Sequence, residues 1–292
     1  MPTAHVNGID IEYVTEGDPD HPPLLLVMGL GAQLTAWPEG FVDILRQRFF
    51  VIRFDNRDCG LSTKFHEAPS LGSFVVAFFG GEVPVPPYRI EDMADDAAAL
   101  LTHLGVEQAH VVGVSLGGMI TQALAINHQD RFLSAASIMS TTGDWTVGTP
   151  SGEAVTALLR PAARSREEYV EASLLGSQVI GSPGYPSDEA FLRQRAVEAY
   201  DRAYCPEGTA RQLAAILGST DRTEALHGVR IPFLVIHGED DPLLAVSGGR
   251  ATAAAVPGSE LLVIPAMGHD LPQPLWGRIT DAIVANAERA TP

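Results

Sequence analysis

The chain has 292 residues, of which 46% are hydrophobic and 7% aromatic. This length and composition are typical of one large α/β domain with an inserted segment and a sizeable apolar core. The formal net charge of −17 argues against a nucleic-acid backbone or an anionic membrane as a partner, because such surfaces would repel the protein.

The predicted elements begin with two short strands on either side of Asn7-Gly8, a dipeptide that favours a two-residue hairpin turn. The next apolar runs, Leu24–Met28 and Phe49–Phe54, are hydrophobic at nearly every position. Such runs are typical of strands buried on both faces of a parallel sheet. Between residues 90 and 104, apolar side chains recur at three- and four-residue steps, which predicts an amphipathic helix that ends at a glycine.

The C-terminal half repeats these patterns. Three apolar runs predict further strands at Ala135–Met139, Phe233–Ile236 and Leu261–Ile264. A last helix is predicted from Trp276 onward, with its apolar side chains on one face. Strands that alternate with helices at this spacing predict an α/β fold with a mostly parallel central sheet and helices on both faces.

Two segments interrupt this alternation. Residues 144–225 contain helical patterns but no clear strand, so we expect a core of residues 1–143 and 226–292 and an inserted helical cap of residues 144–225. Such a cap can close over a site and exclude water; a helical layer without a lid role is the alternative. The proline-containing stretch from 66 to 88, with an apolar centre at Phe74–Phe79, is expected to be an irregular loop. We expect this stretch either to form part of the wall of an apolar pocket or to pack against the protein without contacting a ligand.

The pentapeptide Gly113–Gly117 has the pattern Gly-x-Ser-x-Gly. It places Ser115 between a predicted strand, Ala109–Val112, and a predicted helix, Leu116–Leu124. A serine at this junction sits on a strained turn that presents its hydroxyl above the sheet edge. The glycines permit the turn because a side chain at either position would crowd the strand or the helix. Ser115 is therefore the candidate nucleophile, and an ordinary glycine-rich turn is the alternative.

A serine nucleophile needs a base, and the base needs an orienting acid. Candidates for both follow the last two predicted strands, at the sheet edge where parallel sheets place their ligand-binding loops. His269 is the candidate general base, since the eight other histidines occupy loop, helix-end or strand-end positions. Asp241 is preferred as the acid because Pro242 sets an extended turn there, and Asp240 and Glu239 are the alternatives.

Together these residues resemble the α/β-hydrolase superfamily, and within it the bacterial esterases, the cofactor-free haloperoxidases and the aclacinomycin methylesterase-like enzymes. The resemblance covers roughly residues 24–63, 90–142 and 231–275. It rests on the pentapeptide and on four further motifs, Leu26-Val27-Met28-Gly29, Asp55-Asn56-Arg57-Asp58-Cys59-Gly60-Leu61-Ser62, His237-Gly238-Glu239-Asp240-Asp241-Pro242 and Gly268-His269. The resemblance implies an α/β-hydrolase fold and a Ser-Asp-His order of the triad. It does not extend to the expected cap of residues 144–225, which shows no matching motif.

The resemblance also implies an oxyanion hole made of two backbone N–H groups, those of Leu30 and Leu116. In this fold the loop that carries Arg57 and Asp58 more often braces the oxyanion segment through an ion pair, so we prefer a structural role to a catalytic one for both residues. No partner base is evident for Cys59, which is interpreted as a buried thiol.

These features predict a serine hydrolase that cleaves a carboxylic ester of a small, fairly apolar substrate. Ser115 attacks the carbonyl carbon, His269 accepts the serine proton, and Asp241 holds the imidazole tautomer, after which water releases the acyl group. This mechanism requires no metal and no organic cofactor. Hydrolysis of a lactone, a thioester or a C–C bond, and perhydrolysis, use the same triad and are alternatives, as is a ligand receptor on a hydrolase scaffold.

The cysteines bear on the cellular location. Cys59 and Cys205 cannot form a disulfide framework, which fits a reducing cytoplasm. The first residues show no basic region followed by an apolar run, so no signal peptide is expected, and no apolar stretch is long enough to span a bilayer. The expected partner is a small-molecule ester, and neither a nucleic acid nor a membrane is expected to bind. The sequence is compatible with a homo-oligomer.

Overall fold

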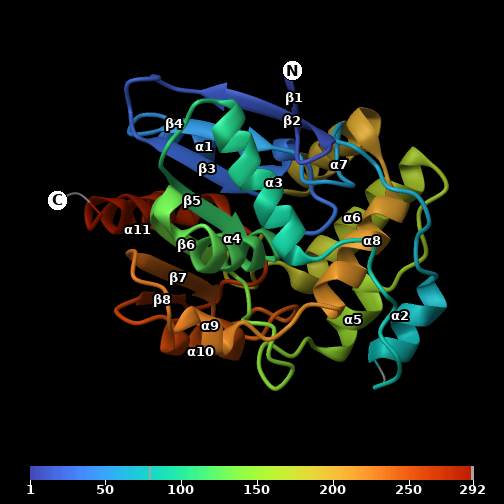
Figure 1. The fold of residues 1–292 in the computed structure, drawn as a ribbon. Coiled ribbons are helices and arrows are strands. Elements are labelled where there is room, and N and C mark those ends of the chain that lie inside the picture. Colours follow the sequence, from blue (N-terminus) through green and yellow to red (C-terminus); the bar gives the residue numbers. More distant parts are fainter. Residues whose placement is uncertain (79, 291–292) are drawn as a thin grey trace.

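The computed structural model describes residues 1–78 and 80–290, and in this part of the chain eight strands form one twisted sheet (Figure 1). The strands are β1 (Thr3–Val6), β2 (Ile9–Glu16), β3 (Pro23–Val27), β4 (Phe50–Phe54), β5 (Ala109–Val114), β6 (Phe132–Ile138), β7 (Phe233–Gly238) and β8 (Glu260–Ile264). Their spatial order is β1-β2-β4-β3-β5-β6-β7-β8. β1 and β2 are antiparallel to each other, and β2 is antiparallel to β4. The other neighbouring strands are parallel, which confirms the predicted mostly parallel sheet.

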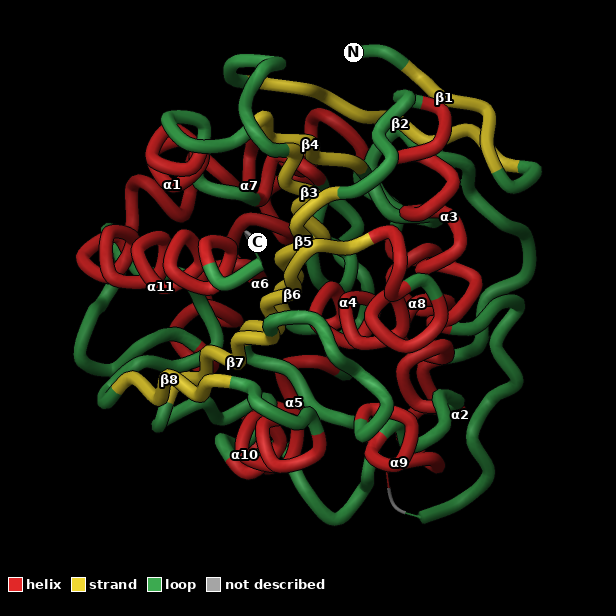
Figure 2. The backbone as a smooth tube through the Cα atoms, turned by 60° about the vertical axis from the view of Figure 1, so that its left-hand side comes forward, coloured by secondary structure: helices red, strands yellow, loops and turns green. Residues whose placement is uncertain are grey.

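Helices cover both faces of the sheet. Those described are α1 (Glu39–Leu45), α2 (Leu71–Phe78), α3 (Ile90–His103), α4 (Leu116–Asn127), α5 (Gly152–Leu158), α6 (Arg166–Ile180), α7 (Glu189–Ala203), α8 (Pro206–Leu217), α9 (Thr223–Leu226), α10 (Ser247–Ala255) and α11 (Trp276–Glu288), with short 3-10 helices η1 (Leu34–Ala36), η2 (Gln129–Arg131) and η3 (Gln273–Leu275). Figure 2 shows the sheet edge-on, with α1 and α11 on one side and α3, α4 and α10 on the other. This arrangement confirms that both faces are covered.

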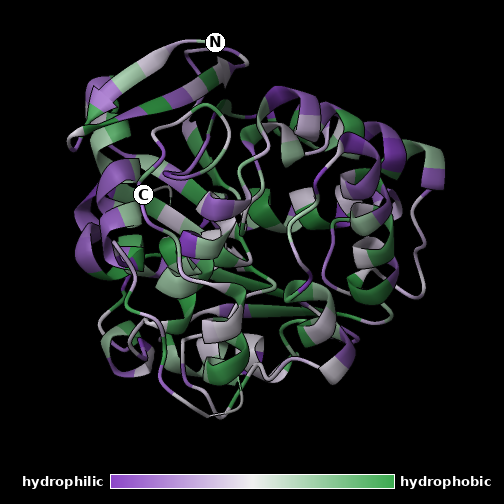
Figure 3. Cartoon of the chain, turned by 90° about the vertical axis from the view of Figure 1, so that its right-hand side faces the viewer, coloured by the Kyte–Doolittle hydropathy of each residue, from purple (hydrophilic) through white to green (hydrophobic). Residues whose placement is uncertain are grey.

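The apolar core therefore has two layers, one on each face of the sheet. One layer packs α3 and α4 against the sheet and includes Met93, Leu100 and Ile120. The other packs α1 and α11 against the opposite face and includes Phe41 and Ile279. The hydrophobic segments gather on the central strands and on the inward faces of the flanking helices (Figure 3). Burial of these apolar surfaces is the main stabilising contribution to the fold.

The predicted hairpin and strands are confirmed with small shifts at their ends. Asn7 and Gly8 have φ values of 50° and 77°, as a two-residue turn with two left-handed residues requires. β6 begins at Phe132, three residues before the predicted start, and the predicted helix that ends at Gly105 is α3. Gly105 has φ 70°, a conformation that side-chain-bearing residues rarely adopt.

The expectation of an irregular loop from 66 to 88 is wrong for part of its length. Residues Leu71–Phe78 form the helix α2, while Phe79 lies outside the described residues. Phe74 and Ala77 of α2 are buried against apolar side chains of α8, among them Leu213 and Leu217. This tertiary packing stabilises a segment whose valines and phenylalanines have low helix propensity. The proline-containing end, residues 83–87, has no regular structure, as predicted.

Residues 144–225, all of which the structure describes, contain the helices α5 to α8, all but the last residue of α9, and no strand. This segment is inserted between the strands β6 and β7. In Figure 1 the helices α5 to α8, together with α2, lie to one side of the sheet. The expected helical content of this insertion is confirmed, and its role as a cap stays a prediction.

His110 on β5 leads to a prediction about the acid stability of the fold. Its side chain is buried, its Nδ1 lies 2.8 Å from Ser134 Oγ, and burial lowers its pKa to about 4. An unfolded chain takes up this proton near pH 6.5. Stability should therefore be lost as the pH falls from about 6.5 to 4, by at most about 3.5 kcal/mol from this residue.

The variant His110→Gln should have lower stability at neutral pH but a smaller further loss on acidification. Urea unfolding at pH 7, 5.5 and 4.5 measures the difference. His66→Asn, at an exposed position, is the matched control and should lose stability with acid as the wild type does. An unchanged acid dependence in His110→Gln would contradict this assignment.

Candidate active site

The turn between β5 and α4 holds Ser115 in a strained backbone conformation, with φ 57° and ψ −119°. A positive φ is costly for a residue with a side chain, and it persists only where the surrounding structure enforces it. A side chain at Gly113 would overlap Gly117, and one at Gly117 would overlap the backbone of Val27. The two glycines thus allow the close approach of strand, turn and helix that the sequence predicted.

The loops after β7 and β8 bring the other two predicted residues to this turn. His269 Nε2 lies 3.0 Å from Ser115 Oγ, and His269 Nδ1 lies 2.7 Å from Asp241 Oδ2. The Asp241 side chain is fully buried and the His269 side chain is 7% exposed. The three side chains therefore form one hydrogen-bonded chain from carboxylate to hydroxyl, although they are 126 and 28 positions apart in sequence order (241 − 115 and 269 − 241).

The electrostatics of Asp241 favour a charged carboxylate. Burial acts to raise its pKa, but the nearby His269 and the hydrogen bonds that the carboxylate accepts outweigh burial, so the pKa lies well below its usual range. The Leu243 and Leu244 N–H groups each donate to Oδ1 at 2.9 Å. Asp241 can therefore stabilise positive charge on the His269 ring while its other oxygen is held by the backbone.

The structure separates Asp241 from the two alternative acids. Glu239 and Asp240 are exposed to solvent, whereas Asp241 is buried and faces His269. His237, interpreted from sequence as a structural histidine, is fully buried and its Nε2 lies 2.7 Å from the Leu244 carbonyl oxygen. This bond ties the end of β7 to the turn that holds Asp241.

The segment after α6 holds the loop that carries His269. The His269 N–H donates to the Ile180 carbonyl at 2.7 Å, and the Gly268 N–H donates to Ser182 Oγ at 2.9 Å. Ser182 is buried and also donates to the Asp270 carboxylate. No sequence pattern indicated a role for Ser182, because its partners lie more than 80 positions away.

The two predicted N–H donors lie close to Ser115. Leu116 follows Ser115 directly, and a Cβ atom on Gly29 would come within 3.1 Å of Ser115 Cβ, so the loop that carries Leu30 packs against the turn. Within the described part of the chain, neither the Leu30 nor the Leu116 N–H donates to a protein acceptor.

In the Asp55–Ser62 loop, Arg57 and Asp58 each form an ion pair, but with α3 and α8 rather than with the oxyanion segment. Arg57 forms a buried bidentate ion pair with Asp96 at 2.6 and 2.8 Å, and Asp58 forms another with Arg211 of α8 at 2.9 and 2.7 Å. Cys59 is buried, and its pKa is raised, first by burial and then by Asp55. A thiol with a raised pKa is a poor nucleophile. Arg211 was not foreseen from the sequence.

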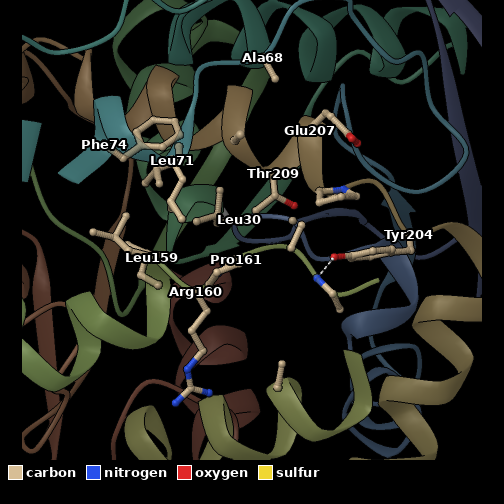
Figure 4. A pocket seen from close by; sticks show the side chains of 18 of the residues that line it. Leu30, Ala68, Leu71, Phe74, Leu159, Arg160, Pro161, Tyr204, Glu207 and Thr209 are labelled. Atoms are coloured by element: carbon tan, nitrogen blue, oxygen red, sulfur yellow. Dashed lines mark hydrogen bonds between the residues drawn. The ribbon is translucent and has the colours of Figure 1, made fainter. Parts of the chain in front are cut away.

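A pocket of about 470 Å³ opens beside the loop that carries Leu30 (Figure 4). Its wall comes from that loop, from α2 and the residues before it, from the segment after α5, and from α6 and α8. The lining is mostly apolar and includes Leu30, Leu71, Phe74, Leu159, Tyr204 and Leu213. The stretch from 66 to 88 thus both packs on α8 and walls the pocket. Ser115, Asp241 and His269 do not line this pocket, whereas Leu30 and Gly31, from the loop that packs against the Ser115 turn, do.

The polar side chains among the residues that line the pocket are Arg160, Tyr169, Ser173, Tyr204, Glu207 and Thr209. Thr209 lies against Gly31, where a Cβ atom would come within 2.6 Å of its hydroxyl oxygen. Tyr204 accepts a hydrogen bond from the Ala163 N–H at 2.8 Å (Figure 4). The guanidinium of Arg160 points away from Leu30 and Phe74 (Figure 4). Among the residues described there is no group of three or more His, Cys, Asp or Glu side chains that could hold a metal ion. Within the same residues no helix is both long and apolar enough to cross a membrane.

Comparisons with known proteins place the chain in a family. Residues 22–272 match the model of the alpha/beta hydrolase fold family, and the chain belongs to this family. It is 28% identical over 313 residues to rhodomycin D methylesterase DnrP of Streptomyces peucetius, covering 100% of both chains. It is 27% identical over 267 residues to 3-oxoadipate enol-lactonase 2 of Acinetobacter baylyi, covering 90% of this chain and 88% of that one.

The fold is also similar to a solved structure. The crystal structure of the enol-lactonase from Burkholderia xenovorans LB400 matches with a TM-score of 0.75 and 24% identity, over 98% of this chain and all of that one. This likeness establishes the arrangement of strands and helices, and the chemistry must be argued from the site itself.

Proposed function

We propose that the protein is a serine hydrolase that cleaves a carboxylic ester, with Ser115, His269 and Asp241 as its catalytic triad. The observation that carries the proposal is the continuous hydrogen-bonded chain from Asp241 through His269 to Ser115. The methylesterase that is similar over the whole chain adds support for an ester as substrate.

The geometry assigns one step to each residue. His269 Nε2 accepts the Ser115 proton as Oγ attacks the carbonyl carbon, and the imidazolium then gives this proton to the leaving alcohol. Asp241 accepts a hydrogen bond from Nδ1–H, which keeps Nε2 as the basic nitrogen and stabilises the imidazolium. Water, deprotonated by the same histidine, then attacks the acyl-enzyme and releases the acid.

The Leu30 and Leu116 N–H groups are proposed to form the oxyanion hole. Negative charge develops on the carbonyl oxygen in the tetrahedral intermediate, and preorganised N–H donors stabilise it most when water is excluded. The helices of residues 144–225 are proposed to act as a cap that provides this exclusion. One wall of the neighbouring pocket comes from these helices, so they would also select the substrate.

Lactone hydrolysis is a second candidate for the same site. The similarity to 3-oxoadipate enol-lactonase 2 extends over 90% of this chain, and opening a lactone requires the same attack on an ester carbonyl. The two activities differ in whether the alcohol leaves or stays attached to the acyl group. A lactone panel assayed beside the ester panel described below distinguishes the two.

A panel of 4-nitrophenyl esters and methyl esters graded by size tests the proposed function and the role of the pocket. Ala210 on α8 lines the pocket, and Ala210→Phe fills part of it. We expect kcat/KM to fall by about tenfold or more for the larger esters, the usual scale of an overpacked apolar site, and by less than about twofold for the acetate. Ala190→Phe, at an exposed position on α7, is the control and should leave kcat/KM unchanged for the larger esters and for the acetate.

Two outcomes would count against these assignments. If the wild-type protein turns over no ester or lactone in the panel, the hydrolase proposal fails. If Ala210→Phe slows small and large esters equally, the pocket does not hold the variable part of the substrate.

A further inference from the structure

The loop that carries Leu30 is held in place from the inserted helices. The N–H of Gly31, the residue after Leu30, donates to Gln212 Oε1 at 2.8 Å. The same amide group donates through Nε2 to the Arg57 carbonyl at 2.8 Å. Gln212 lies on α8 and is fully buried. One side chain from the insertion thus bridges two loops of the core at the position of a proposed oxyanion donor.

Further bonds from α7 hold the rest of this loop. Gln33 Nε2 donates to the carbonyls of Ala199 and Ala203 at 2.7 and 3.0 Å, and Gln33 Oε1 accepts from Arg202 at 2.6 Å. Arg202 also pairs with Asp55 at 2.8 Å, and Asp55 accepts the Leu34 N–H at 2.7 Å. The loop is therefore held at its C-terminal end by α7 and at its centre by α8.

The bond at Gly31 has the most direct effect on Leu30. It orients the peptide group between Leu30 and Gly31, and through it the backbone angles of Leu30, whose N–H is one peptide unit away. Gly31 has φ 63° and, without a side chain, could adopt other backbone conformations at little cost. Without the Gln212 amide the loop would lose its preorganisation, which is the property that makes N–H donors effective.

We propose that Gln212 is a positioning residue for the Leu30 N–H, so that the oxyanion hole is complete only when α8 is packed against the core. This inference rests on the proposed function. Thr209, Ala210 and Leu213 on the same helix line the pocket. A substrate group that packs against these residues would stabilise the helix position that holds Leu30, so that remote binding contributes to the transition state.

The variant Gln212→Leu removes both hydrogen bonds at nearly constant volume. Loss of a whole oxyanion donor typically costs about 10²- to 10³-fold in kcat, and a misplaced donor should cost less, roughly 10- to 100-fold. KM should change by less than about threefold. The Ki of a trifluoromethyl ketone, which forms a tetrahedral adduct with an oxyanion, should rise by about the factor by which kcat/KM falls. Gln212→Glu keeps the acceptor for Gly31 and should lose less activity.

Asn286→Leu is the matched control, because Asn286 is also a buried amide that donates to a backbone carbonyl, Ala135 at 3.0 Å, but lies on α11. It should lower the thermal unfolding midpoint and leave kcat within about twofold. The proposal is overturned if Gln212→Leu keeps kcat and the ketone Ki within about twofold, or if Asn286→Leu shows the same kinetic loss. If Gln212→Leu does not fold, Gln212→Met, which removes the same two hydrogen bonds with an unbranched side chain, is judged by the same changes in kcat and in the ketone Ki.

Failure of the proposed function is a separate result. It would appear as a wild-type protein without ester or lactone turnover and without covalent labelling of Ser115, whereas failure of the positioning role would appear only in the Gln212 variants.

Discussion

Replacing Ser115 by alanine should reduce ester turnover by roughly 10⁴- to 10⁶-fold, while the fold is retained. The hydroxyl is the attacking atom in the proposed mechanism, and loss of a triad nucleophile leaves only the contributions of binding and of the oxyanion hole. Oγ is 3.0 Å from His269 Nε2, so the base would face no proton donor in the variant. Steady-state kinetics on the most reactive ester of the panel measure the loss.

Covalent labelling provides the second measurement. A fluorophosphonate should modify wild-type Ser115 with one label per chain, detected on its peptide by mass spectrometry, and should not label Ser115→Ala. Ser137→Ala is the control, since Ser137 is a buried serine on β6 whose hydroxyl contacts the Gly118 carbonyl. It should keep activity within a few-fold. Full ester turnover by Ser115→Ala would rule out the acyl-enzyme mechanism.

The second large effect is expected for Asp241→Asn, with a loss of about 10⁴-fold in kcat by analogy with other triads. An amide at this position can donate to His269 Nδ1 and so favours the tautomer whose Nε2 carries the proton and cannot act as a base. The variant should fold, because the asparagine oxygen can still accept the Leu243 and Leu244 N–H groups that now bind Oδ1.

Asp240→Asn is the matched control, with the same chemical change one residue earlier at an exposed position. It should change kcat by less than about threefold. Equal losses in the two variants would mean that the acidic cluster acts as a whole rather than through Asp241. Circular dichroism and thermal unfolding of both variants separate a catalytic loss from a loss of structure.

Local patterns in the sequence were sufficient to predict the central strands, the helices α3, α4 and α11 beside them, and the three proposed triad residues. The reason is that parallel strands end at the same edge of the sheet, so residues just after β5, β7 and β8 must meet there. The helices α1 and α10 were not predicted. The sequence preferred Asp241 over Asp240 because Pro242 follows it, and the structure adds the reason in three dimensions. The two are neighbours, and only the path of the turn decides which carboxylate is buried against His269.

The helix α2 shows where local patterns fail. Its sequence is flanked by proline and glycine and is rich in residues with weak helix propensity, so it was expected to be a loop. Its stability comes from packing of Phe74 and Ala77 on α8, and this contact is between segments more than 130 positions apart.

By itself, the sequence determined the fold class and the chemistry available to it: a serine at a strained strand-to-helix turn, followed in order by an acid and a histidine at later strand ends. Only the tertiary structure decided how the proposed oxyanion loop is held and what shape of pocket opens beside it. The physical reason is the range of the interactions. Gln212 and Gly31 are 181 positions apart, and a hydrogen bond over that distance leaves no periodic pattern in the chain.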